Sequence, residues 1–272
     1  MKTLGSFLLA LVLACNLAIA QDTLYIYEGG IIVTMRPVAH IDSITFYRNA
    51  FIPQTEKVTD VDGNEYGTVK IGTQVWMVEN LKTTKYNDWT SIPLASDGTV
   101  WANLTTPGYC YYNNDVANKN IYGVLYNWYT INTGKLAPTG WHVPTDAEWT
   151  TLENYLIANG YNYDGTTTGN KIAKSLAALT GWTTCTGIGA IGNDLTKNNT
   201  SGFSALPGGY RGSYFGLGNG AFYLVGDYGN WWSSTQFGAS NAWYRGLYGG
   251  TTVDRDHYYN KSSGFSVRCL RD

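Results

Sequence analysis

The chain has 272 residues, a formal net charge of −2 and charged side chains at only 14% of its positions. The sequence lacks a basic stripe, which argues against nucleic acid as a partner, because nucleic-acid binding requires a clustered positive face. The length suffices for one large domain with a small appendage, and abundant tyrosine, tryptophan, glycine and asparagine are typical of loop-rich extracellular binding surfaces.

Residues 1–20 have the pattern of a signal peptide. Lys2 is followed by an apolar run at 7–13, and the sequence AIA at 18–20 gives the small-x-small motif of a cleavage site. The run is shorter than the about 20 apolar residues that cross a bilayer, so no membrane span is expected. We therefore predict an exported protein, secreted or at the cell surface. The sequence LVLAC leaves a second interpretation open, in which Cys15 is acylated and serves as a lipid anchor.

Residues 21–50 are predicted to form a small β-strand module. The segments LYIY and IIVTM flank a Gly-Gly pair at 29–30, which is a hairpin signal, and SITFY follows at 43–47. A unit this short cannot bury a core of its own, so we expect it to dock on its neighbour or on an assembly partner. Residues 51–57 are interpreted as a linker to one domain at residues 58–272.

The first part of this domain, residues 58–81, predicts two β segments, each folded around a glycine-containing turn. Asp60, Asp62 and Asn64 have the opening spacing of a calcium loop, which needs a bidentate glutamate at its twelfth position. Ile71 occupies that position, so these polar residues are interpreted as turn formers. A CxxC motif and a Cys/His cluster are also missing from the sequence, and we expect neither a metal site nor a cofactor.

Three short helices are predicted. Apolar residues recur at helical spacing in YGVLYNWYTI, residues 122–131, and in KIAKSLAAL, residues 171–179. Between them, TDAEW at 145–149 contains a capping box, in which Thr145 caps the backbone N–H of Glu148 and the Glu148 carboxylate returns to Thr145.

The helix that starts at this capping box is predicted to turn Glu153 towards water. Its buried stripe is Trp149, Leu152 and Leu156. His142 precedes the cap, outside the helix, and is not expected to pair with the capping glutamate as in an HExxH metal site. The acidic residues of this segment are therefore explained by helix initiation rather than by catalysis.

The chain after the third helix consists of turns and strands. In the last strand, Phe265, Val267 and Cys269 are expected to point one way, into the core. An oxidising compartment favours one disulfide among the three cysteines that follow the leader. We predict a bridge between Cys110 and Cys269, which both lie on strand-like segments, with Cys185 free in a loop.

Six segments occur in chain order: VTDVDGNEYGTVKIGTQVWMVENLKTTKY, YGVLYNWYT, PTGWHVPTDAEWTTLE, SGFSALPGGYRG, WWSST and GFSVRCLRD. Together they closely resemble the Fibrobacter succinogenes major paralogous domain family. HVPTDAEW is also similar to a motif of formylglycine-generating-enzyme-like domains. The resemblance implies an α+β, C-type-lectin-like fold with two or three short helices and a loop-rich antiparallel β half. The copper-binding cysteine pair of those enzymes and the calcium motifs EPN, QPD and WND of lectins are missing here, so neither activity is expected.

We therefore predict a non-catalytic binding or adhesion module at the cell surface, with a glycan or a protein as its ligand. Ligand contacts are expected from aromatic-rich loops, at Tyr214, Tyr244, Arg245, Tyr248 and Tyr258. Tyrosine is intermediate in burial, so any one of these can instead belong to the core. Core positions are expected for Trp231, Trp232 and Phe265.

Two other functions remain open. A glycan-processing enzyme such as a glycoside hydrolase requires two carboxylates about 5–9.5 Å apart, and the loop residues Asp227, Asp254 and Asp256 are the candidates. A structural subunit of a surface assembly would use the β module at residues 21–50 for edge pairing with another chain.

Overall fold

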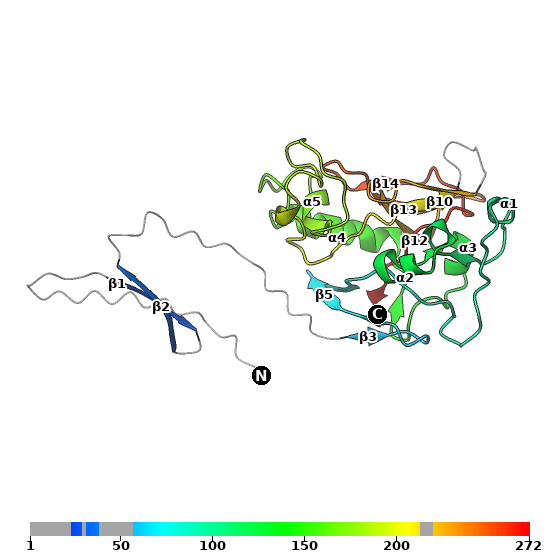
Figure 1. The fold of residues 1–272 in the computed structure, drawn as a ribbon, viewed down its shortest axis with the longest axis horizontal. Coiled ribbons are helices and arrows are strands. Elements are labelled where there is room, and N and C mark those ends of the chain that lie inside the picture. Colours follow the sequence, from blue (N-terminus) through cyan, green and yellow to red (C-terminus); the bar gives the residue numbers. More distant parts are fainter. Residues whose placement is uncertain (1–22, 29–30, 38–56, 213–219) are drawn as a thin grey trace, which may run out of the picture. The chain divides into compact units, whose positions relative to one another are not determined.

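The computed structural model describes residues 23–28, 31–37, 57–212 and 220–272 (Figure 1). The chain divides into two compact units, of which the first ends at Asn49. In this first unit, β1 (Thr23–Glu28) and β2 (Ile31–Pro37) form an antiparallel hairpin, as predicted. The predicted signal peptide, the strand expected at residues 43–47 and Cys15 lie outside the described residues.

The second unit, Ala50–Asp272, combines short helices with several small antiparallel sheets, which confirms the α+β class (Figure 1). Its helices are α1 (Gly98–Ala102), η2 (Tyr112–Asn114), α2 (Ala117–Tyr122), α3 (Trp128–Ile131), α4 (Asp146–Ala158), α5 (Ala173–Leu176) and η3 (Leu195–Lys197). Its strands are β3 (Val58–Thr59), β4 (Glu65–Tyr66), β5 (Thr68–Ile71), β6 (Gln74–Met77), β7 (Tyr109–Cys110), β8 (Leu125–Tyr126), β9 (Trp141–His142), β10 (Tyr210–Gly212), β11 (Ala221–Tyr223), β12 (Gly229–Gln236), β13 (Ala242–Leu247), β14 (Asp254–Asp256) and β15 (Leu270–Arg271).

The last strand closes the domain onto its beginning. In the four-stranded sheet β5-β6-β15-β9, Leu270 of β15 lies opposite Trp76 of β6 and opposite His142 of β9. A three-stranded sheet, β12-β13-β14, contains the longest strand of this unit. Both hairpins predicted for residues 58–81 are present, as β3–β4 and β5–β6.

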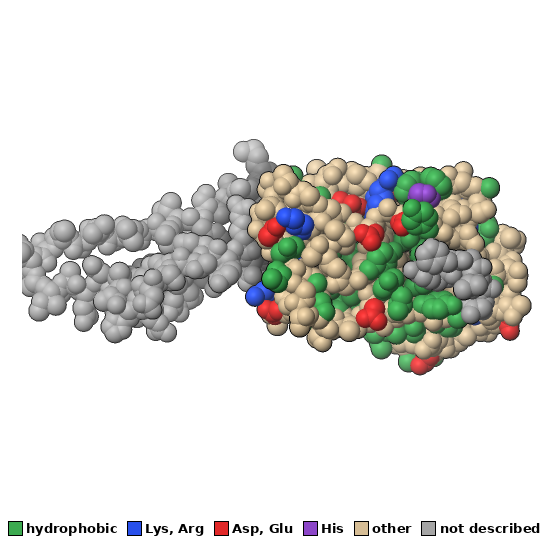
Figure 2. All heavy atoms as spheres, turned by 90° about the horizontal axis from the view of Figure 1, so that it is seen from above, with side chains coloured by type: hydrophobic (Ala, Val, Ile, Leu, Met, Phe, Trp, Pro, Cys, Tyr) green, Lys and Arg blue, Asp and Glu red, His purple; other side chains and the backbone are tan. Residues whose placement is uncertain are grey.

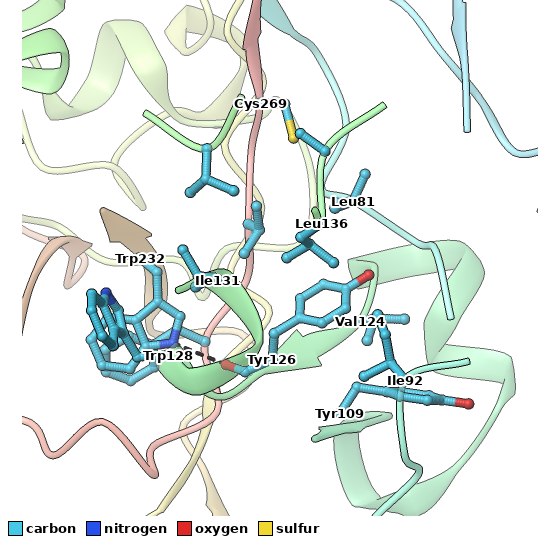
Figure 3. Close-up of a cluster of buried hydrophobic side chains, with 14 of the residues drawn as sticks. Leu81, Ile92, Tyr109, Val124, Tyr126, Trp128, Ile131, Leu136, Trp232 and Cys269 are labelled. Carbon is cyan, nitrogen blue, oxygen red and sulfur yellow. Dashed lines mark hydrogen bonds between the residues drawn. The ribbon is translucent and has the colours of Figure 1, made fainter. Parts of the chain in front are cut away.

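Two large clusters of buried side chains form the core. The first gathers tyrosines around Trp232 and Phe265 (Figure 3), and the second gathers Trp76, Trp149 and Trp231. The core positions predicted for Trp231, Trp232 and Phe265 are confirmed. Phe265, Val267 and Cys269 all belong to the first cluster, so their predicted inward direction is confirmed, although the last strand, β15, is limited to Leu270–Arg271.

The prediction of one helix at residues 122–131 is wrong. The segment contains the end of α2, the strand β8 and then α3. The interruption lies at Gly123, which has a φ of +82° and packs against Asn80, so that a Cβ there would lie 2.7 Å from the Asn80 Cβ. Only glycine adopts this conformation at such close range without strain. The helix predicted at 171–179 exists as the shorter α5.

Helix α4 begins at the predicted capping box. The Thr145 hydroxyl accepts the backbone N–H of Glu148 at 3.2 Å, and Glu148 Oε2 accepts the N–H of Thr145 at 2.8 Å. The apolar stripe predicted for this helix is buried. Glu153 was expected to face water, but it is buried and forms an ion pair with Arg245.

The predicted Cys110–Cys269 disulfide is absent. Cys110, Cys185 and Cys269 are all free thiols. Cys110 packs with Trp101 in a small third cluster, whereas Cys269 belongs to the first large cluster. Cys269 points inward, as predicted, and Cys110 is also buried, but in a different part of the core. Burial raises the pKa of Cys110 to about 12.

Within the described residues, no helix is both long enough and apolar enough to cross a membrane.

Candidate functional site

Four ring side chains form a contiguous surface, here called the aromatic platform: Phe237, Trp243, His257 and Tyr258. The side chains of Phe237 and Tyr258 are 52% and 77% exposed. The His257 ring centroid lies 3.6 Å from that of Phe237 and 5.1 Å from that of Tyr258, with an interplanar angle of 34° in both pairs. Trp243 packs edge-on against Phe237. The rings therefore form a continuous step-like surface that is open to solvent.

The platform lies at one end of the sheet β12-β13-β14. Phe237 directly follows β12, Trp243 lies on β13, and His257 directly follows β14. Seen from the side on which Figure 1 places β13 and β14, hydrophobic side chains gather in a band on the surface, and a histidine lies among them (Figure 2).

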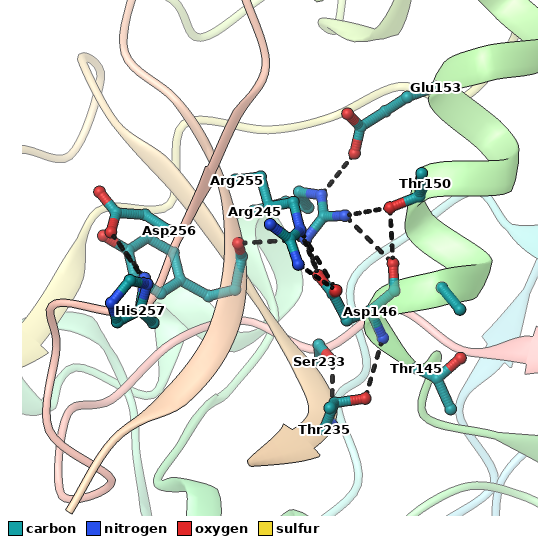
Figure 4. Close-up of polar contacts among 12 residues, drawn as sticks. Thr145, Asp146, Thr150, Glu153, Ser233, Thr235, Arg245, Arg255, Asp256 and His257 are labelled. Carbon is teal, nitrogen blue, oxygen red and sulfur yellow. Dashed lines mark hydrogen bonds and ion pairs between the residues drawn. The ribbon is translucent and has the colours of Figure 1, made fainter. Parts of the chain in front are cut away.

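Arg255 fixes the platform to helix α4. Its guanidinium carbon lies 3.7 Å from the Trp243 ring centroid, and its Nη2 donates to Asp146 Oδ2 at 2.7 Å (Figure 4). Asp146 is the first residue of α4, where the helix dipole also favours a negative charge. Burial raises the pKa of Asp146, but the hydrogen bonds from Arg255 and Arg245 outweigh it, and the pKa falls below its ordinary value.

A fully buried arginine continues this network into the core. Arg245 donates from Nη1 to Asp146 Oδ1 at 2.7 Å and from Nη2 to the Thr150 hydroxyl at 3.0 Å, and its Nε donates to Glu153 (Figure 4). Burial raises the pKa of Glu153, and the charge of Arg245 offsets this rise only in part. The two carboxylates and two guanidinium groups neutralise one another, so this network leaves no net charge beneath the platform.

Lys261 fixes the turn that presents Phe237. Its buried ammonium group donates to the backbone oxygens of Gly238 and Ala239 at 2.8 and 3.0 Å, and it lies 4.6 Å from the Trp128 ring centroid. Asn241, in the same turn, donates from Nδ2 to the backbone oxygen of His257 at 2.8 Å. These contacts hold the platform in one arrangement before any ligand arrives, which lowers the entropy lost on binding.

The other face of β13 and β14 presents tyrosines and carboxylates. Tyr244 lies opposite Asp256, and Gly246 lies opposite Asp254. The Tyr248 ring folds over Gly246, where a Cβ would come within 2.2 Å of the ring. Burial raises the pKa of Tyr248, and the charges of Asp254 and Asp256 raise it further.

The structure separates the five predicted contact residues. Tyr244 and Arg245 are buried on β13, which makes them unavailable to a ligand in this conformation, and Tyr248 is half-buried against the core. Tyr258 is exposed within the platform, and Tyr214 lies outside the described residues. The loop prediction was wrong for Tyr244 and Arg245 because their segment forms an inner strand rather than a loop.

The sequence-based prediction of ligand contacts did not include three platform members, Phe237, Trp243 and His257. The available signal was an aromatic residue within the polar turn QFGASN, and the strand alternation that places Trp243 on the face opposite Tyr244. The position of His257 beside Phe237 depends on pairing between β13 and β14, which the sequence does not specify.

Two of the three carboxylates considered for a glycan-processing enzyme share one strand. Asp254 and Asp256 lie on β14, whereas Asp227 lies in a turn before β12. Asp60 accepts the backbone N–H groups of Asp62 and Asn64, which confirms its role as a turn former. Within the described residues, no three His, Cys, Asp or Glu side chains are grouped to hold a metal ion.

His142 does contact the capping glutamate, contrary to expectation. Its Nε2 lies 3.0 Å from Glu148 Oε1, and its Nδ1 lies 2.7 Å from Asp272 Oδ1. The contact is possible because β9 pairs with β15, which brings both the histidine and the C-terminal segment next to the start of α4. This arrangement joins β9, the start of α4 and the C-terminal residue through one histidine side chain.

These observations define an α+β protein whose loop-rich antiparallel half presents a rigid aromatic surface. The sequence model of the Fibrobacter succinogenes major domain family matches residues 69–271, and the chain belongs to this family. The family indicated by the six sequence segments is thereby confirmed. No curated protein and no solved structure gives a significant match to the chain.

Proposed function

We propose that this protein is an exported, non-catalytic binding or adhesion module that contacts a glycan or a protein at the cell surface. The observation that carries the proposal is the aromatic platform, in which exposed rings are held by Arg255 and Lys261 before any ligand arrives. Rigid aromatic side chains provide large contact areas at low entropic cost, and they dominate the binding energy of many interfaces.

The proposed scaffold is C-type-lectin-like. Support comes from the C-terminal strand β15, which pairs with both β6 and β9, and from the long loop-rich segment between α4 and that strand. Export is supported by the signal-peptide pattern at residues 1–20, with lipidation of Cys15 as the alternative route to the cell surface.

The test uses the mature chain on glycan and protein arrays, followed by titration of the ligand that binds best. We expect Phe237→Ala and Tyr258→Ala each to weaken binding about 30-fold, because truncation of a central aromatic contact costs about 2 kcal/mol. Trp89→Ala is the matched control, since Trp89 is an exposed aromatic residue outside the platform.

Thermal melting checks that each variant is folded. Equal affinity of the parent and both platform variants would contradict the proposal, and so would an equal loss of affinity in Trp89→Ala.

A further inference from the structure

A row of three residues crosses the sheet on the face opposite the platform tryptophan. Asn230 of β12 lies opposite Gly246 of β13, and Gly246 lies opposite Asp254 of β14. Asp256 shares this face, because it lies two residues further along the same strand. The middle position of the row has no side chain of its own, and the ring of Tyr248 fills the space above it.

In the described part of the chain, the two carboxylates of this face, Asp254 and Asp256, form no ion pair with a lysine or an arginine. Asp254 accepts one hydrogen bond, from the Thr252 hydroxyl at 3.1 Å. Asp256 accepts the backbone N–H of His257 at 2.6 Å, and the nearest ring nitrogen of His257 lies 4.0 Å away. Among the described residues, neither carboxylate pairs with a lysine or an arginine. Five other aspartates of the domain do so: Asp62, Asp88, Asp146, Asp164 and Asp194.

Among the described residues, no positive charge offsets the burial of the Asp254 carboxyl group. Burial raises the pKa of this carboxyl group, the Thr252 hydroxyl lowers it, and the negative charge of Asp256 raises it again, so that the pKa is above its ordinary value. The ionised form of Asp254 is therefore disfavoured by its surroundings in the folded protein.

Asn230 supplies an independent observation at the other end of the row. The residue is 1% exposed, and neither its Nδ2 nor its Oδ1 has a hydrogen-bond partner among the residues that the structure describes. Buried amides in native proteins are almost always hydrogen-bonded, because an unpaired buried polar group is costly. The Asn230 amide, in register with Gly246 and Asp254, therefore adds an acceptor to this face that the described side chains do not use.

The tyrosines favour a cation as that group. The ring centroids of Tyr228 and Tyr248 lie 4.4 Å apart at the edge of this face, and π faces attract positive charge. Asp254, Asp256 and Asn230 Oδ1 are all hydrogen-bond acceptors, and a primary ammonium group has three donors on one compact charge. The Tyr248 ring covers Gly246, the middle position of the row, so a ligand that reaches Asn230 from this face must displace the ring.

We infer that this face binds the ammonium group of a lysine side chain presented by a polypeptide partner, between Asp254, Asp256 and Asn230 and beneath the ring of Tyr248. A metal ion fits less well, because the face provides only two carboxylates and one amide oxygen. The inference does not depend on the aromatic platform, which lies on the other face of β13.

The probe is the blocked heptapeptide GSGKGSG, titrated into the full mature chain while the side-chain amide of Asn230 and the ring of Tyr248 are followed by NMR. We expect both signals to shift on binding. The peptide with acetyl-lysine should leave both unchanged, because acetylation removes the charge. Asp254→Asn should weaken binding about tenfold or more.

Asp164→Asn is the matched control, since it removes the same formal charge from a carboxylate that is already paired with Lys171. It should bind the peptide like the parent. Asp254→Asn should also melt at a temperature equal to or above that of the parent, because it removes a disfavoured charge; a residue with a purely structural role would lower it.

The inference is overturned if Asp254→Asn binds the peptide normally, if Asp164→Asn loses as much affinity, or if the acetyl-lysine peptide binds equally well. Calcium chloride that shifts the same signals and displaces the peptide would identify a metal site instead. n-Butylamine that binds as tightly as the peptide would identify a small amine, and not a polypeptide, as the ligand. Phe237→Ala should bind the lysine peptide like the parent, so that failure here and failure of the platform proposal are separable.

Discussion

One side chain, Arg245, links strand β13 to helix α4 through ion pairs with Asp146 and Glu153. Arg245 has no exposed surface, and its partners Asp146 and Glu153 are 99 and 92 residues away in the sequence. An apolar stripe along a helix identifies its buried face, but Glu153 lies at the margin of that stripe, where the sequence alone favours exposure. Strand β13, which carries Arg245, determines the burial of Glu153, and the residues next to Glu153 in the sequence contain no information about that strand.

Glu153→Gln is expected to destabilise the domain. The substitution keeps the shape of the side chain but leaves Arg245 and Arg255 to share the single charge of Asp146. We expect a loss of about 3 kcal/mol in the free energy of unfolding, because removing one partner of a buried pair leaves an uncompensated charge. Urea denaturation measures the change. Lys135→Met, which removes an exposed partner of Asp88, should have a much smaller effect, and equal effects of the two substitutions would contradict the argument.

At the scale of elements, the start of α4 shows which contacts can be predicted from neighbouring residues in the sequence and which cannot. The capping box was predicted correctly because all of its atoms lie within four consecutive residues. The contact between His142 and Asp272 was not predicted, because it joins positions 130 residues apart through the pairing of β9 with β15. The interruption at Gly123 was missed for the same reason, since the close neighbour that requires glycine there is Asn80.

The His142 contacts predict a pH dependence of stability. Burial lowers the pKa of His142, but hydrogen bonds to Asp272 and Glu148 outweigh it, and the folded pKa lies above the ordinary value of 6.5. The stabilisation that His142 provides is fully present below its pKa in the unfolded chain. It is lost as the pH rises through its pKa in the folded protein. Burial raises the pKa of Glu148, but contacts with Thr145 and His142 lower it below 4.5, so its contribution is lost only in more acidic solution.

The contribution of His142 should therefore be greatest between pH 4.5 and 6.5. We expect His142→Gln to lower the melting temperature more at about pH 5.5 than at about pH 8.5. The corresponding difference in the free energy of unfolding should be less than about 1 kcal/mol, because these groups are partly exposed. Differential scanning calorimetry of both proteins at the two pH values measures this difference. A deficit that stays constant, or that grows towards alkaline pH, would show that the histidine acts through packing alone.

At the scale of the whole molecule, the sequence specified the class, the family and the inward-facing residues better than the surface. The hairpins, the cap of α4 and the alternation of Phe265 and Val267 follow from local rules, and these predictions were correct. The aromatic platform is assembled from three segments that the β12-β13-β14 sheet brings together. Register between distant strands depends on tertiary packing, so the composition of the exposed surface could not be predicted from periodicity.

The loop-rich half of the domain relies on buried cations. Lys174, Arg211, Lys261 and Arg268 are all buried, and in the described part of the chain they donate to backbone and amide oxygens and to no carboxylate. Loops leave many carbonyl oxygens without helix or sheet partners, and each of these needs a donor when it is buried. One long cationic side chain satisfies several such oxygens at once, which explains how extended irregular segments pack within this domain.

Lys174 provides the clearest test of this role. Its ammonium group donates to the backbone oxygens of Ala190 and Asp194 and to Asn198 Oδ1, at 3.3, 3.1 and 2.9 Å, and also to the backbone oxygen of Asn193. Lys174→Met preserves the length and apolar volume of the side chain but leaves these acceptors unpaired inside the protein.

We expect Lys174→Met to reduce stability by about 3 kcal/mol, which corresponds to a fall of about 6–12 °C in melting temperature for a domain of this size. Lys197→Met is the matched control, because Lys197 is an exposed lysine of the adjoining η3 turn whose ammonium group contacts only Asp194 among the described side chains. Amide hydrogen exchange should also increase selectively in residues 190–198, since the loop loses the group that holds it. If Lys174→Met melts like Lys197→Met and the loop remains protected, the buried ammonium is not what orders this segment, and packing of Ile191 in the second core cluster would be sufficient.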